Sequence, residues 1–320
     1  MAFESVNPAT GEKVRRYRAA SGLEISEALD AATAAFHSWS RIAVSDRALH
    51  LHGAANVLRE SKKKWALLMA EEMGKPVSQA AGEQLKKVVL ELGGSDPYVI
   101  LEDADLAQAA AGCAEGRLIN AGQSCIAAKR MIVVGSAMER FRELLVREMS
   151  ARRMGDPREE STHIGPLARA DIRLAVASQV ARSLSAGARC LLGGQSPEGP
   201  GFFYPPTVLV DVKPGMPAFD EEVFGPVAAL IRAESQADAI RLANESSYGL
   251  GAAVYTTDLR TGERIAREDL MAGSCFVNAY VRSDPRLPFG GIRGSGVGRE
   301  LSAFGIREFV NVKTVWVQDR

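Results

Sequence analysis

Two residues of this sequence could carry nucleophilic or acid–base chemistry, and the first is Cys125. It ends the run Asn120-Ala121-Gly122-Gln123-Ser124-Cys125. Glycine and small polar residues permit a tight turn whose free backbone N–H groups can lower a thiol pKa and stabilise a developing oxyanion. The alternative is a buried structural cysteine that packs as a small hydrophobic residue. The local sequence leaves both interpretations open.

Glu91 is the second candidate, because it lies among apolar residues just before two glycines. It follows Val88-Val89-Leu90 and precedes Leu92, Gly93 and Gly94. Burial at the end of a strand would disfavour the charged carboxylate and raise its pKa toward that of a useful general base. The alternative is a glutamate that points into solvent from the strand end. The segment alone does not decide between the two.

Other residue patterns that could carry chemistry are better explained by a structural role. The glycines at 290, 291, 294, 296 and 298 do not form GxGxxG and do not follow a strand, so we expect a tightly packed loop there. His50 and His52 lie two apart on an expected helix and face different directions, which argues against a metal site. Cys113 and Cys275 lie within apolar patterns and are expected in the core.

Composition places the chain among globular proteins. Of its 320 residues, 46% are hydrophobic and 24% are charged, and 39 Lys and Arg balance 39 Asp and Glu. These values argue against a disordered chain and against a nucleic-acid binder that acts through bulk charge. We expect no membrane-spanning helix, because no run of about 18 apolar residues is present. Residues 1–16 lack the apolar core of a secretory signal and the four cysteines are widely spaced, so we expect a cytoplasmic protein.

The elements that must position these residues change in character near residue 86. Before it, Ser21 and Glu24 can form a capping box ahead of a helix at 25–39, and further helices are expected at 45–58 and 64–73. After it, strand-like and helix-like segments alternate, which predicts an α/β fold with a largely parallel sheet. The expected strands are at 88–92, 97–101, 131–134, 190–192, 207–210, 227–231, 252–255 and 274–278, and the expected helices at 105–120, 137–149, 172–186, 236–244 and 259–268.

Several segments are more specific together than any one of them. They are Asn7-Pro8-Ala9-Thr10-Gly11-Glu12, Glu91-Leu92-Gly93-Gly94-Ser95-Asp96-Pro97, Gly122-Gln123-Ser124-Cys125, Glu221-Glu222-Val223-Phe224-Gly225-Pro226, Pro288-Phe289-Gly290-Gly291 and Ser295-Gly296-Val297-Gly298-Arg299-Glu300. Their order and spacing closely resemble the aldehyde dehydrogenase superfamily. Segments 91–97 and 299–304 are most similar to its bacterial succinate-semialdehyde dehydrogenase branch. The resemblance implies an aldehyde dehydrogenase-like catalytic domain with a parallel sheet.

The resemblance implies a role for each matched residue. Cys125 would attack the aldehyde carbon, and hydride transfer from the hemithioacetal to NAD or NADP would give a thioester. Glu91 would activate the water that hydrolyses this thioester. The implied cofactor contacts are Glu222, on the nicotinamide ribose, and Phe224, and the implied supports of the substrate pocket are Asn278, Phe289 and Ser295. The implied substrate is a small aldehyde, in particular a semialdehyde such as succinate semialdehyde.

The resemblance also defines a departure from the family. At 83–85 the N-terminal helices join the Glu91 strand directly, where the family has most of its nucleotide-binding domain, roughly 130–150 residues. We therefore expect 1–91 to be the helical remnant of a truncated Rossmann-type NAD(P)-binding domain, 92–302 the catalytic domain, and 303–320 an oligomerisation strand. The lost block would carry an oxyanion-binding asparagine and contacts to the adenosine and the pyrophosphate. Ile119 stands where many members of the branch carry a substrate-binding arginine, with Arg117 two residues upstream.

Three functions remain open on the sequence. The first is an NAD(P)-dependent aldehyde dehydrogenase whose cofactor binding and oxidation are impaired in this form. The second is a cofactor-independent thiol esterase that uses Cys125 and Glu91, because acylation and deacylation need no hydride acceptor. The third is a non-catalytic partner that assembles with a full-length paralogue, or with its own copies, through the catalytic domain and the tail at 309–317. None of the three involves a metal, nucleic acid or a membrane.

Overall fold

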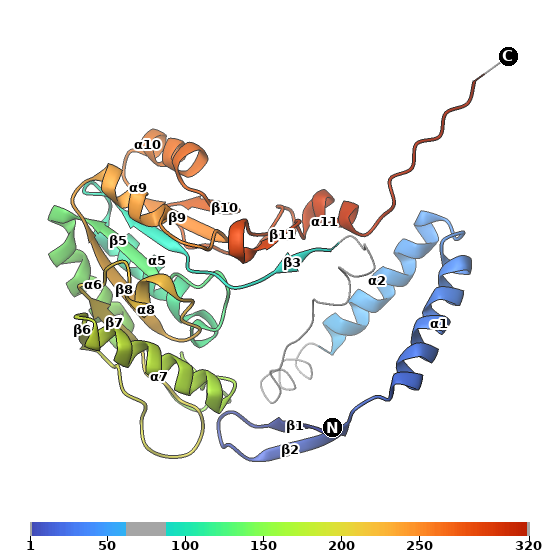
Figure 1. Cartoon of the computed structure of the whole chain (residues 1–320), viewed down its shortest axis with the longest axis horizontal. Helices are drawn as coiled ribbons and strands as arrows, with labels where there is room; N and C mark the ends of the chain where they lie inside the picture. Colours follow the sequence, from blue (N-terminus) through green and yellow to red (C-terminus); the bar gives the residue numbers. More distant parts are fainter. Residues whose placement is uncertain (1, 62–87, 319–320) are drawn as a thin grey trace. The chain divides into compact units, whose positions relative to one another are not determined.

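The computed structural model of the chain describes residues 2–61 and 88–318 (Figure 1). These residues belong to two compact units, 1–75 and 76–320, and each is described by itself. The helix expected at 64–73 and the junction expected at 83–85 lie outside the described residues.

The N-terminal unit begins with a β-hairpin that the sequence analysis did not predict. Strands β1 (Ala2–Val6) and β2 (Lys13–Arg18) pair antiparallel. Their turn is closed by hydrogen bonds from the Asn7 N–H to the Glu12 carbonyl (2.8 Å) and from the Gly11 N–H to the Asn7 carbonyl (2.7 Å). Gly11 supplies the positive φ of 77° that the turn needs. The expected helical character of residues 1–91 is therefore wrong for the hairpin, where turn chemistry decides the structure.

Two helices follow the hairpin and agree with the prediction. Helix α1 (Gly22–Trp39) starts at the predicted capping box: Ser21 Oγ accepts the Glu24 N–H (3.3 Å), and the Glu24 carboxylate accepts the Ser21 N–H (2.7 Å). Helix α2 (Val44–Glu60) covers the second predicted helix. Both helices leave large apolar side chains exposed, among them Leu23, Leu29, Phe36, Leu49 and Leu51. These faces therefore contribute little apolar burial to the unit.

Among the described residues, the second unit is an α/β domain built on a seven-stranded sheet, as predicted. The strand order is β10-β9-β4-β5-β8-β7-β6, and neighbours are parallel except for β6 and β7. The strands are β4 (Pro97–Ile100), β5 (Arg130–Val134), β6 (Arg189–Leu192), β7 (Thr207–Val210), β8 (Val227–Ala233), β9 (Gly251–Tyr255) and β10 (Ser274–Val277). Each strand overlaps a segment that the alternating pattern predicted as extended.

Helices cover both faces of this sheet. Helix α5 (Leu106–Leu118) connects β4 to β5, and α6 (Met138–Ser150) packs against it. Helices α9 (Gln236–Asn244) and α10 (Leu259–Arg264, continued by a π-helical turn at Ile265–Asp269) lie in the connections from β8 to β9 and from β9 to β10. These connections run along the sheet in the opposite direction to the β4–β5 connection. Since parallel crossovers are right-handed, α5 and α9 cover opposite faces. Helix α7 (Ala170–Ser185) packs on the short α8 (Pro217–Asp220).

The core lies along the central strands. Every residue of β4, β5 and β9 is buried, and α5 and α6 bury Cys113, Phe141 and Leu145 completely. Large apolar side chains in such positions contribute about 1.5–3 kcal/mol each relative to exposure. The predicted core position of Cys113 is confirmed, whereas Cys275 on β10 is only partly buried.

Smaller elements complete the unit. Strand β3 (Leu90–Glu91) pairs antiparallel with β11 (Gly296–Val297), so the strand predicted at 88–92 is shorter and lies outside the main sheet. A Cβ on Gly296 would lie 1.9 Å from the Leu90 carbonyl oxygen, which confirms the tightly packed glycine loop. Helix α11 (Ser302–Glu308) is followed by residues 311–318, which have no regular secondary structure. Residues 303–308 of the expected strand are therefore helical, and pairing of the tail with another chain stays a prediction.

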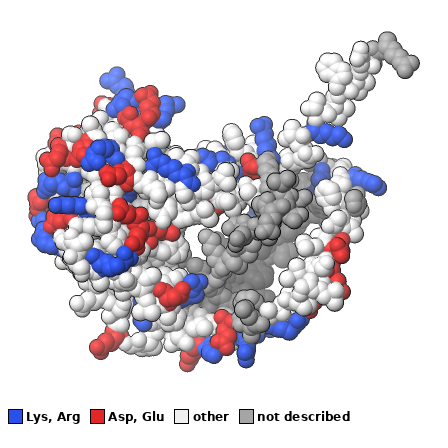
Figure 2. Space-filling view, viewed as in Figure 1, with Lys and Arg blue, Asp and Glu red and all other residues white. Residues whose placement is uncertain are grey.

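The surface is mixed in charge. Acidic and basic side chains are interspersed on the face of the sheet unit drawn in Figure 2, in keeping with a formal net charge of zero. The tail exposes apolar side chains, including Phe309, Val312 and Trp316. No helix in the described part of the chain is long and apolar enough to cross a membrane.

Candidate active site

The candidate residues gather at the amino edge of the parallel sheet. Gly94 and Asp96 directly precede β4, and Cys125 lies just before β5. Open parallel sheets more often bind ligands outside the carboxyl ends of their strands. Here α5 runs back from the carboxyl end of β4 to the start of β5, and the nucleophile loop follows α5 directly. The crossover helix thus returns Cys125 to the edge at which β4 begins.

The loop before Cys125 has a strained backbone. Asn120, Ala121 and Gly122 have positive φ values of 50°, 54° and 76°, a conformation that costs a non-glycine residue about 1–2 kcal/mol. Glycine is required at the third position, because a Cβ on Gly122 would lie 2.3 Å from the carbonyl oxygen of Gly225. The buried Arg117 guanidinium donates a hydrogen bond to the Gly122 carbonyl (2.7 Å). The fold therefore stabilises a strained turn immediately before the nucleophile.

The arginine near the expected substrate position serves this loop. Arg117 is 1% exposed, so its guanidinium does not face an open pocket, while Ile119 is 39% exposed. Gln123 adds a second support: its Oε1 accepts the Ala168 N–H (2.7 Å) and its Nε2 donates to the Asn120 carbonyl (3.2 Å). These contacts position Cys125 from both sides of the turn.

Cys125 itself is half-buried against Gly94. A Cβ on Gly94 would lie 2.0 Å from the Cys125 carbonyl oxygen, so only glycine permits this approach. Burial is the main cause that raises the thiol pKa, and three carboxylates raise it further, those of Asp96, Glu91 and Glu222. One nearby backbone N–H has the opposite effect but does not outweigh them. The thiol is therefore largely protonated at neutral pH, and the lowered pKa that the sequence suggested is not what the surroundings produce.

Glu91 faces the interior at the end of β3. Both of its carboxylate oxygens are buried, and none of the described residues forms a hydrogen bond with them. Burial, and then the carboxylate of Glu300, raise the pKa of Glu91 to about 7 against the opposing effect of Arg299. A Cβ on Gly290 would lie 2.9 Å from Glu91 Oε1, so the turn at 289–291 closes over the carboxyl group. The carboxylate oxygens of Glu91 are thus buried although the residue as a whole is only partly buried, and the group titrates where a general base is effective.

Glu222 contacts the glycine turn formed by Gly93 and Gly94. Its Oε1 accepts the Gly94 N–H (2.9 Å), and a Cβ on Gly93 would lie 2.5 Å from its Oε2. Phe224, two residues further along this loop, is half-buried. The turn at Gly93 and Gly94 therefore brings together Cys125, Glu91 and Glu222, which are far apart in the sequence.

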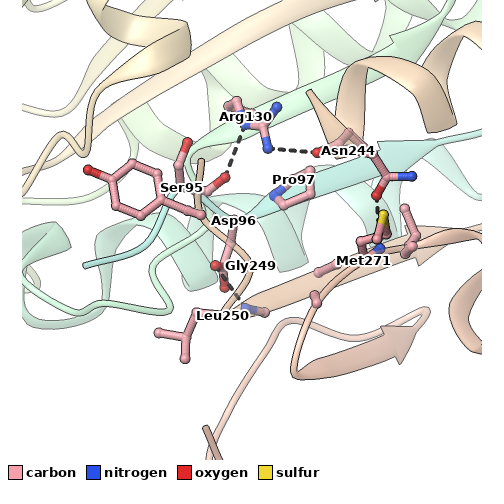
Figure 3. A pocket seen from close by; sticks show the side chains of 14 residues that line it. Ser95, Asp96, Pro97, Arg130, Asn244, Gly249, Leu250 and Met271 are labelled. Atoms are coloured by element: carbon pink, nitrogen blue, oxygen red, sulfur yellow. Dashed lines mark hydrogen bonds between the residues drawn. The ribbon is translucent and has the colours of Figure 1, made fainter. Parts of the chain in front are cut away.

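Two cations with no predicted role hold the surrounding loops. The buried Lys129 ammonium donates to the carbonyls of Phe219 (2.8 Å) and Glu221 (2.6 Å), next to Glu222. The buried Arg130 guanidinium donates through Nε to the Ser95 carbonyl (3.0 Å) and reaches the last carbonyls of α9, as Figure 3 shows in part. Burial lowers the pKa of both groups, that of Arg130 to about 10. The sequence signal that could have identified Lys129 and Arg130 is the presence of two consecutive charged residues at the start of an apolar strand.

Two of the residues predicted to support the substrate pocket, Ser295 and Phe289, lie around Glu91. The hydroxyl of Ser295 is fully buried, donates to the Gly93 carbonyl (2.7 Å) and accepts the Gly249 N–H (3.0 Å). Phe289 is 7% exposed and exchanges two backbone hydrogen bonds with Glu300 (2.8 and 2.7 Å). Both residues brace the backbone around Glu91, and a direct contact with substrate stays a prediction.

The structure does not bring Asn278 to Cys125. Its side-chain amide accepts the Thr256 N–H (2.9 Å) and donates to the Thr256 carbonyl (2.8 Å) at the carboxyl end of β9. Asp103 binds the Thr256 hydroxyl there as well (2.7 Å), beside a cavity of about 460 Å³. Asn278 therefore supports the opposite edge of the sheet.

The described residues fit one end of a nicotinamide cofactor. The Glu222 carboxylate can accept hydrogen bonds from ribose hydroxyls, and its close approach to Gly93 and Gly94 places it at the turn that adjoins Cys125. A dinucleotide also needs a pyrophosphate site, often a glycine-rich turn at a helix N-terminus, and the sequence holds no GxGxxG. Within the described ranges, no three His, Cys, Asp or Glu side chains are grouped as metal ligands.

The fold and the site agree with one family. The family model for the aldehyde dehydrogenase family matches residues 1–84 and 76–315. The chain therefore belongs to the aldehyde dehydrogenase family.

Two curated relatives and one solved structure show which proteins the chain is similar to. The chain is 48% identical over 248 residues to a probable succinate-semialdehyde dehydrogenase of Synechocystis sp. whose name specifies NADP(+), covering 78% of this chain and 54% of that protein. It is 49% identical over 243 residues to the succinate semialdehyde dehydrogenase Sad of Escherichia coli, named for NAD(P)+, covering 76% and 52%. The chain thus spans about half the length of these curated relatives. A solved chain from a structural study of cofactor and substrate selection by Gox0499 matches with a TM-score of 0.94 at 26% identity, covering 99% of this chain and 100% of that one.

Proposed function

We propose that Cys125 is the nucleophile of a site that oxidises a small semialdehyde, such as succinate semialdehyde, to a carboxylate through a cysteine thioester. The observation that carries the proposal is the position of Glu91, a buried carboxyl group with a pKa of about 7 beside a half-buried thiol at one glycine turn. The names of the two bacterial relatives support a semialdehyde as the substrate class.

The reaction begins with removal of the thiol proton. Because the pKa of the Cys125 thiol is raised, a base must accept this proton at neutral pH. The neighbouring Glu91, about half ionised near pH 7, is that base. The sulfur then bonds to the aldehyde carbon, and the carbonyl oxygen takes up the proton held by Glu91 to give a hemithioacetal, which leaves Glu91 ionised again. The backbone of the strained turn holds the sulfur in place for this step.

Oxidation converts the hemithioacetal into a thioester: the substrate carbon loses a hydride and the hydroxyl oxygen loses its proton to solvent. NAD or NADP, when bound, supplies the acceptor for the hydride that leaves the substrate carbon. Glu222 and Phe224 are the residues that would hold its nicotinamide end. Water then attacks the thioester carbon while Glu91 takes the water proton, and the C–S bond breaks to release the acid and restore the thiol.

The two halves of this reaction depend on different parts of the protein. Acylation and deacylation need water and the two residues Cys125 and Glu91, which lie near the Gly93–Gly94 turn. Oxidation also needs the rest of a dinucleotide site, and we infer that this chain alone carries out the oxidative half poorly. A lost oxyanion donor would slow both halves by a factor of about 10²–10³, because ester cleavage also passes through oxyanions. On this account the isolated chain behaves mainly as a thiol esterase.

Two assays on the full chain separate these halves. Hydrolysis of p-nitrophenyl acetate reports acylation and deacylation, and nicotinamide reduction with succinate semialdehyde reports the oxidation. We expect ester turnover that falls by about 10³-fold or more in Cys125→Ala, because the nucleophile is lost. Cys190→Ala is the matched control, since Cys190 is also a partly buried thiol but lies on β6.

Either assay can contradict the proposal. Ester turnover that persists in Cys125→Ala would show that Cys125 is not the nucleophile. Nicotinamide reduction at about 10 s⁻¹, an average enzyme turnover, would support the oxidation of a semialdehyde and contradict the inference that this chain carries out the oxidative half poorly.

The tail favours a second function, assembly with a full-length paralogue. Phe309, Val312 and Trp316 are each more than four-fifths exposed, which is unfavourable unless another surface covers them. Native mass spectrometry of the protein purified from its own cell tests this candidate. A chain that never co-purifies with a paralogue would exclude it.

A further inference from the structure

Asp96 is a buried acid that the reaction described above does not use. It is 1% exposed and directly precedes β4. Its Oδ1 accepts the Gly251 N–H (3.0 Å) at the start of β9. Its backbone carbonyl accepts the N–H groups of Lys129 (3.2 Å) and Arg130 (3.1 Å) at the start of β5. Asp96 therefore joins the amino ends of three central strands, and Figure 3 shows it between the Gly249–Leu250 segment and Arg130.

The same carboxyl group lies directly behind the nucleophile. A Cβ on Gly94 would meet the Cys125 carbonyl oxygen at 2.0 Å and Asp96 Oδ1 at 3.4 Å, so both groups lie close to Gly94. Asp96 Oδ2 is buried and forms no hydrogen bond with the described residues. A Cβ on Gly251 would lie 2.3 Å from this oxygen, so the carboxyl group has little room to move. Its charge therefore acts on Cys125 from a fixed position.

Charges on several elements face this carboxyl group. Arg130 and Arg117 favour its ionised form, whereas burial, the largest effect, and Glu222 favour the protonated form. The balance raises the pKa of Asp96 to about 7. The titratable groups that Asp96 faces are Arg117 on α5, Arg130 on β5, Glu222 in the loop before β8, Tyr98 on β4, Cys275 on β10 and Cys125. Asp96 thus acquires its negative charge near neutral pH, before a buried thiol ionises.

We propose that Asp96 is the positioning residue of the nucleophile: its carboxyl group, held by the Gly251 N–H, lies close to Gly94 beside the Cys125 loop, and its negative charge controls how readily the thiol reacts in the free protein. The inference rests on the proposed function only in naming Cys125 as the nucleophile. A protonated thiol resists alkylation and oxidation, because the thiolate is the reactive species. The thiolate then forms when Glu91 accepts its proton during catalysis.

The test is the pH profile of alkylation at Cys125. The full chain is treated with iodoacetamide from about pH 6 to about pH 10, and the labelled peptide is quantified by mass spectrometry. Asp96→Asn keeps the shape of the side chain and an acceptor for the Gly251 N–H but removes the charge. We expect its profile to move to lower pH, with alkylation at about pH 7.5 faster by about tenfold.

Two controls separate charge from structure. Cys190 in the same protein is an internal reference, because its surroundings do not include Asp96. Asp103→Asn removes an acid near the opposite end of β4, next to Thr256, and should leave the Cys125 profile unchanged. An unchanged Cys125 profile in a folded Asp96→Asn protein overturns the proposal, because a purely structural role would not move a thiol titration.

A second measurement applies if Asp96→Asn does not fold. In Glu91→Gln, the other acid with a pKa of about 7 is absent and Asp96 is unchanged. Coupling to Asp96 then predicts an inflection in the alkylation profile near pH 7, as the carboxyl group ionises. A profile that follows a single thiol ionisation overturns the proposal. Alkylation needs neither aldehyde nor cofactor, so this result does not depend on whether the chain turns over a substrate.

Discussion

The N-terminal unit and the sheet unit follow the same local rules but differ in what their apolar side chains contact. Helix α1 begins with a complete capping box, yet its Leu29 is 63% exposed. Helix α6 has no side-chain cap, yet its Leu145 is 0% exposed because it packs within the sheet unit. Local signals are therefore enough to define a helix. Burial of its apolar face needs a second layer of structure, which the described N-terminal residues do not supply.

A pair of identical substitutions tests this contrast most strongly. Leu145→Ala should lower the free energy of unfolding by about 2–5 kcal/mol, because it leaves a cavity in a packed core. Leu29→Ala should change it by no more than about 0.5 kcal/mol, because the side chain is already exposed. Urea unfolding followed by circular dichroism measures both. Equal losses would mean that the face of α1 is packed against another surface in solution.

Glycine substitutions should act in opposite directions in the two units. Gly122→Ala should destabilise the sheet unit by about 1–3 kcal/mol and reduce ester turnover, because the new Cβ would lie 2.3 Å from the Gly225 carbonyl oxygen at a positive φ. Gly53→Ala, in α2, has no atom within 4 Å of its new Cβ and should stabilise the helix by about 0.5–1 kcal/mol. Thermal melts compare the two variants. A neutral Gly122→Ala would contradict the close approach at the nucleophile loop.

The sequence predicted the sheet unit well, for a physical reason. Segments such as 131–134 and 236–244 have a strong apolar run or a clear helical period, and the structure places β5 and α9 on them. Strand β2 was missed because all six of its residues are exposed, so no alternation of buried and exposed positions marks it. The hairpin depends on its turn, and in the sequence only the residues from Asn7 to Gly11 indicate that turn.

The site was predictable in its reactive groups but not in their support. Cys125 and Glu91 stand out because each lies beside glycines in an otherwise apolar or small-residue segment. Asp96 and Lys129 resemble ordinary charged residues at strand ends, and their burial follows only from strand pairing far along the chain. For the same reason the sequence suggested a lowered thiol pKa: it reveals backbone N–H groups near Cys125 but not the three carboxylates.

The pH dependence of stability should also distinguish the units. The pKa of Asp96 is about 7 in the folded state, against an ordinary value of about 3.9. Its favourable contribution is therefore present below about pH 4 and lost as the pH rises through about 7. Asp96→Asn should gain stability relative to the unmodified protein between about pH 5 and about pH 8. Thermal melts of both proteins at both pH values give the difference in stability between them. The contributions of the other titrating groups cancel in this difference. A difference that stays constant between the two pH values would contradict the raised pKa of Asp96.

Glu24, in the N-terminal unit, provides the opposite sign. The Arg18 side chain, and then Ser21, lower its pKa to about 2, so its favourable contribution is present above about pH 4 and lost as the pH falls. Glu24→Gln should therefore be less helical than the unmodified chain at neutral pH and approach it at low pH. Circular dichroism at both pH values checks this expectation. A difference that grows on acidification would contradict the role of the carboxylate.

A local effect is expected at the start of α1. Ser21→Ala removes one hydrogen bond of the capping box and should cost about 0.5–2 kcal/mol of local helix stability. Because α1 contributes little burial, the loss should appear as fraying in circular dichroism, with ester turnover unchanged. A fall in ester turnover would show that the N-terminal unit contributes to the site.

Trapping of the acyl intermediate tests the central claim most directly. The unmodified chain and Glu91→Gln are acetylated with p-nitrophenyl acetate at alkaline pH, where the thiol ionises without a base, and then returned to neutral pH. Peptide mass spectrometry follows the acetyl group. We expect it on Cys125 in both proteins, with rapid loss from the unmodified chain and persistence in Glu91→Gln. An acetyl group on another residue, or equal rates of loss, would contradict a thioester site built from Cys125 and Glu91.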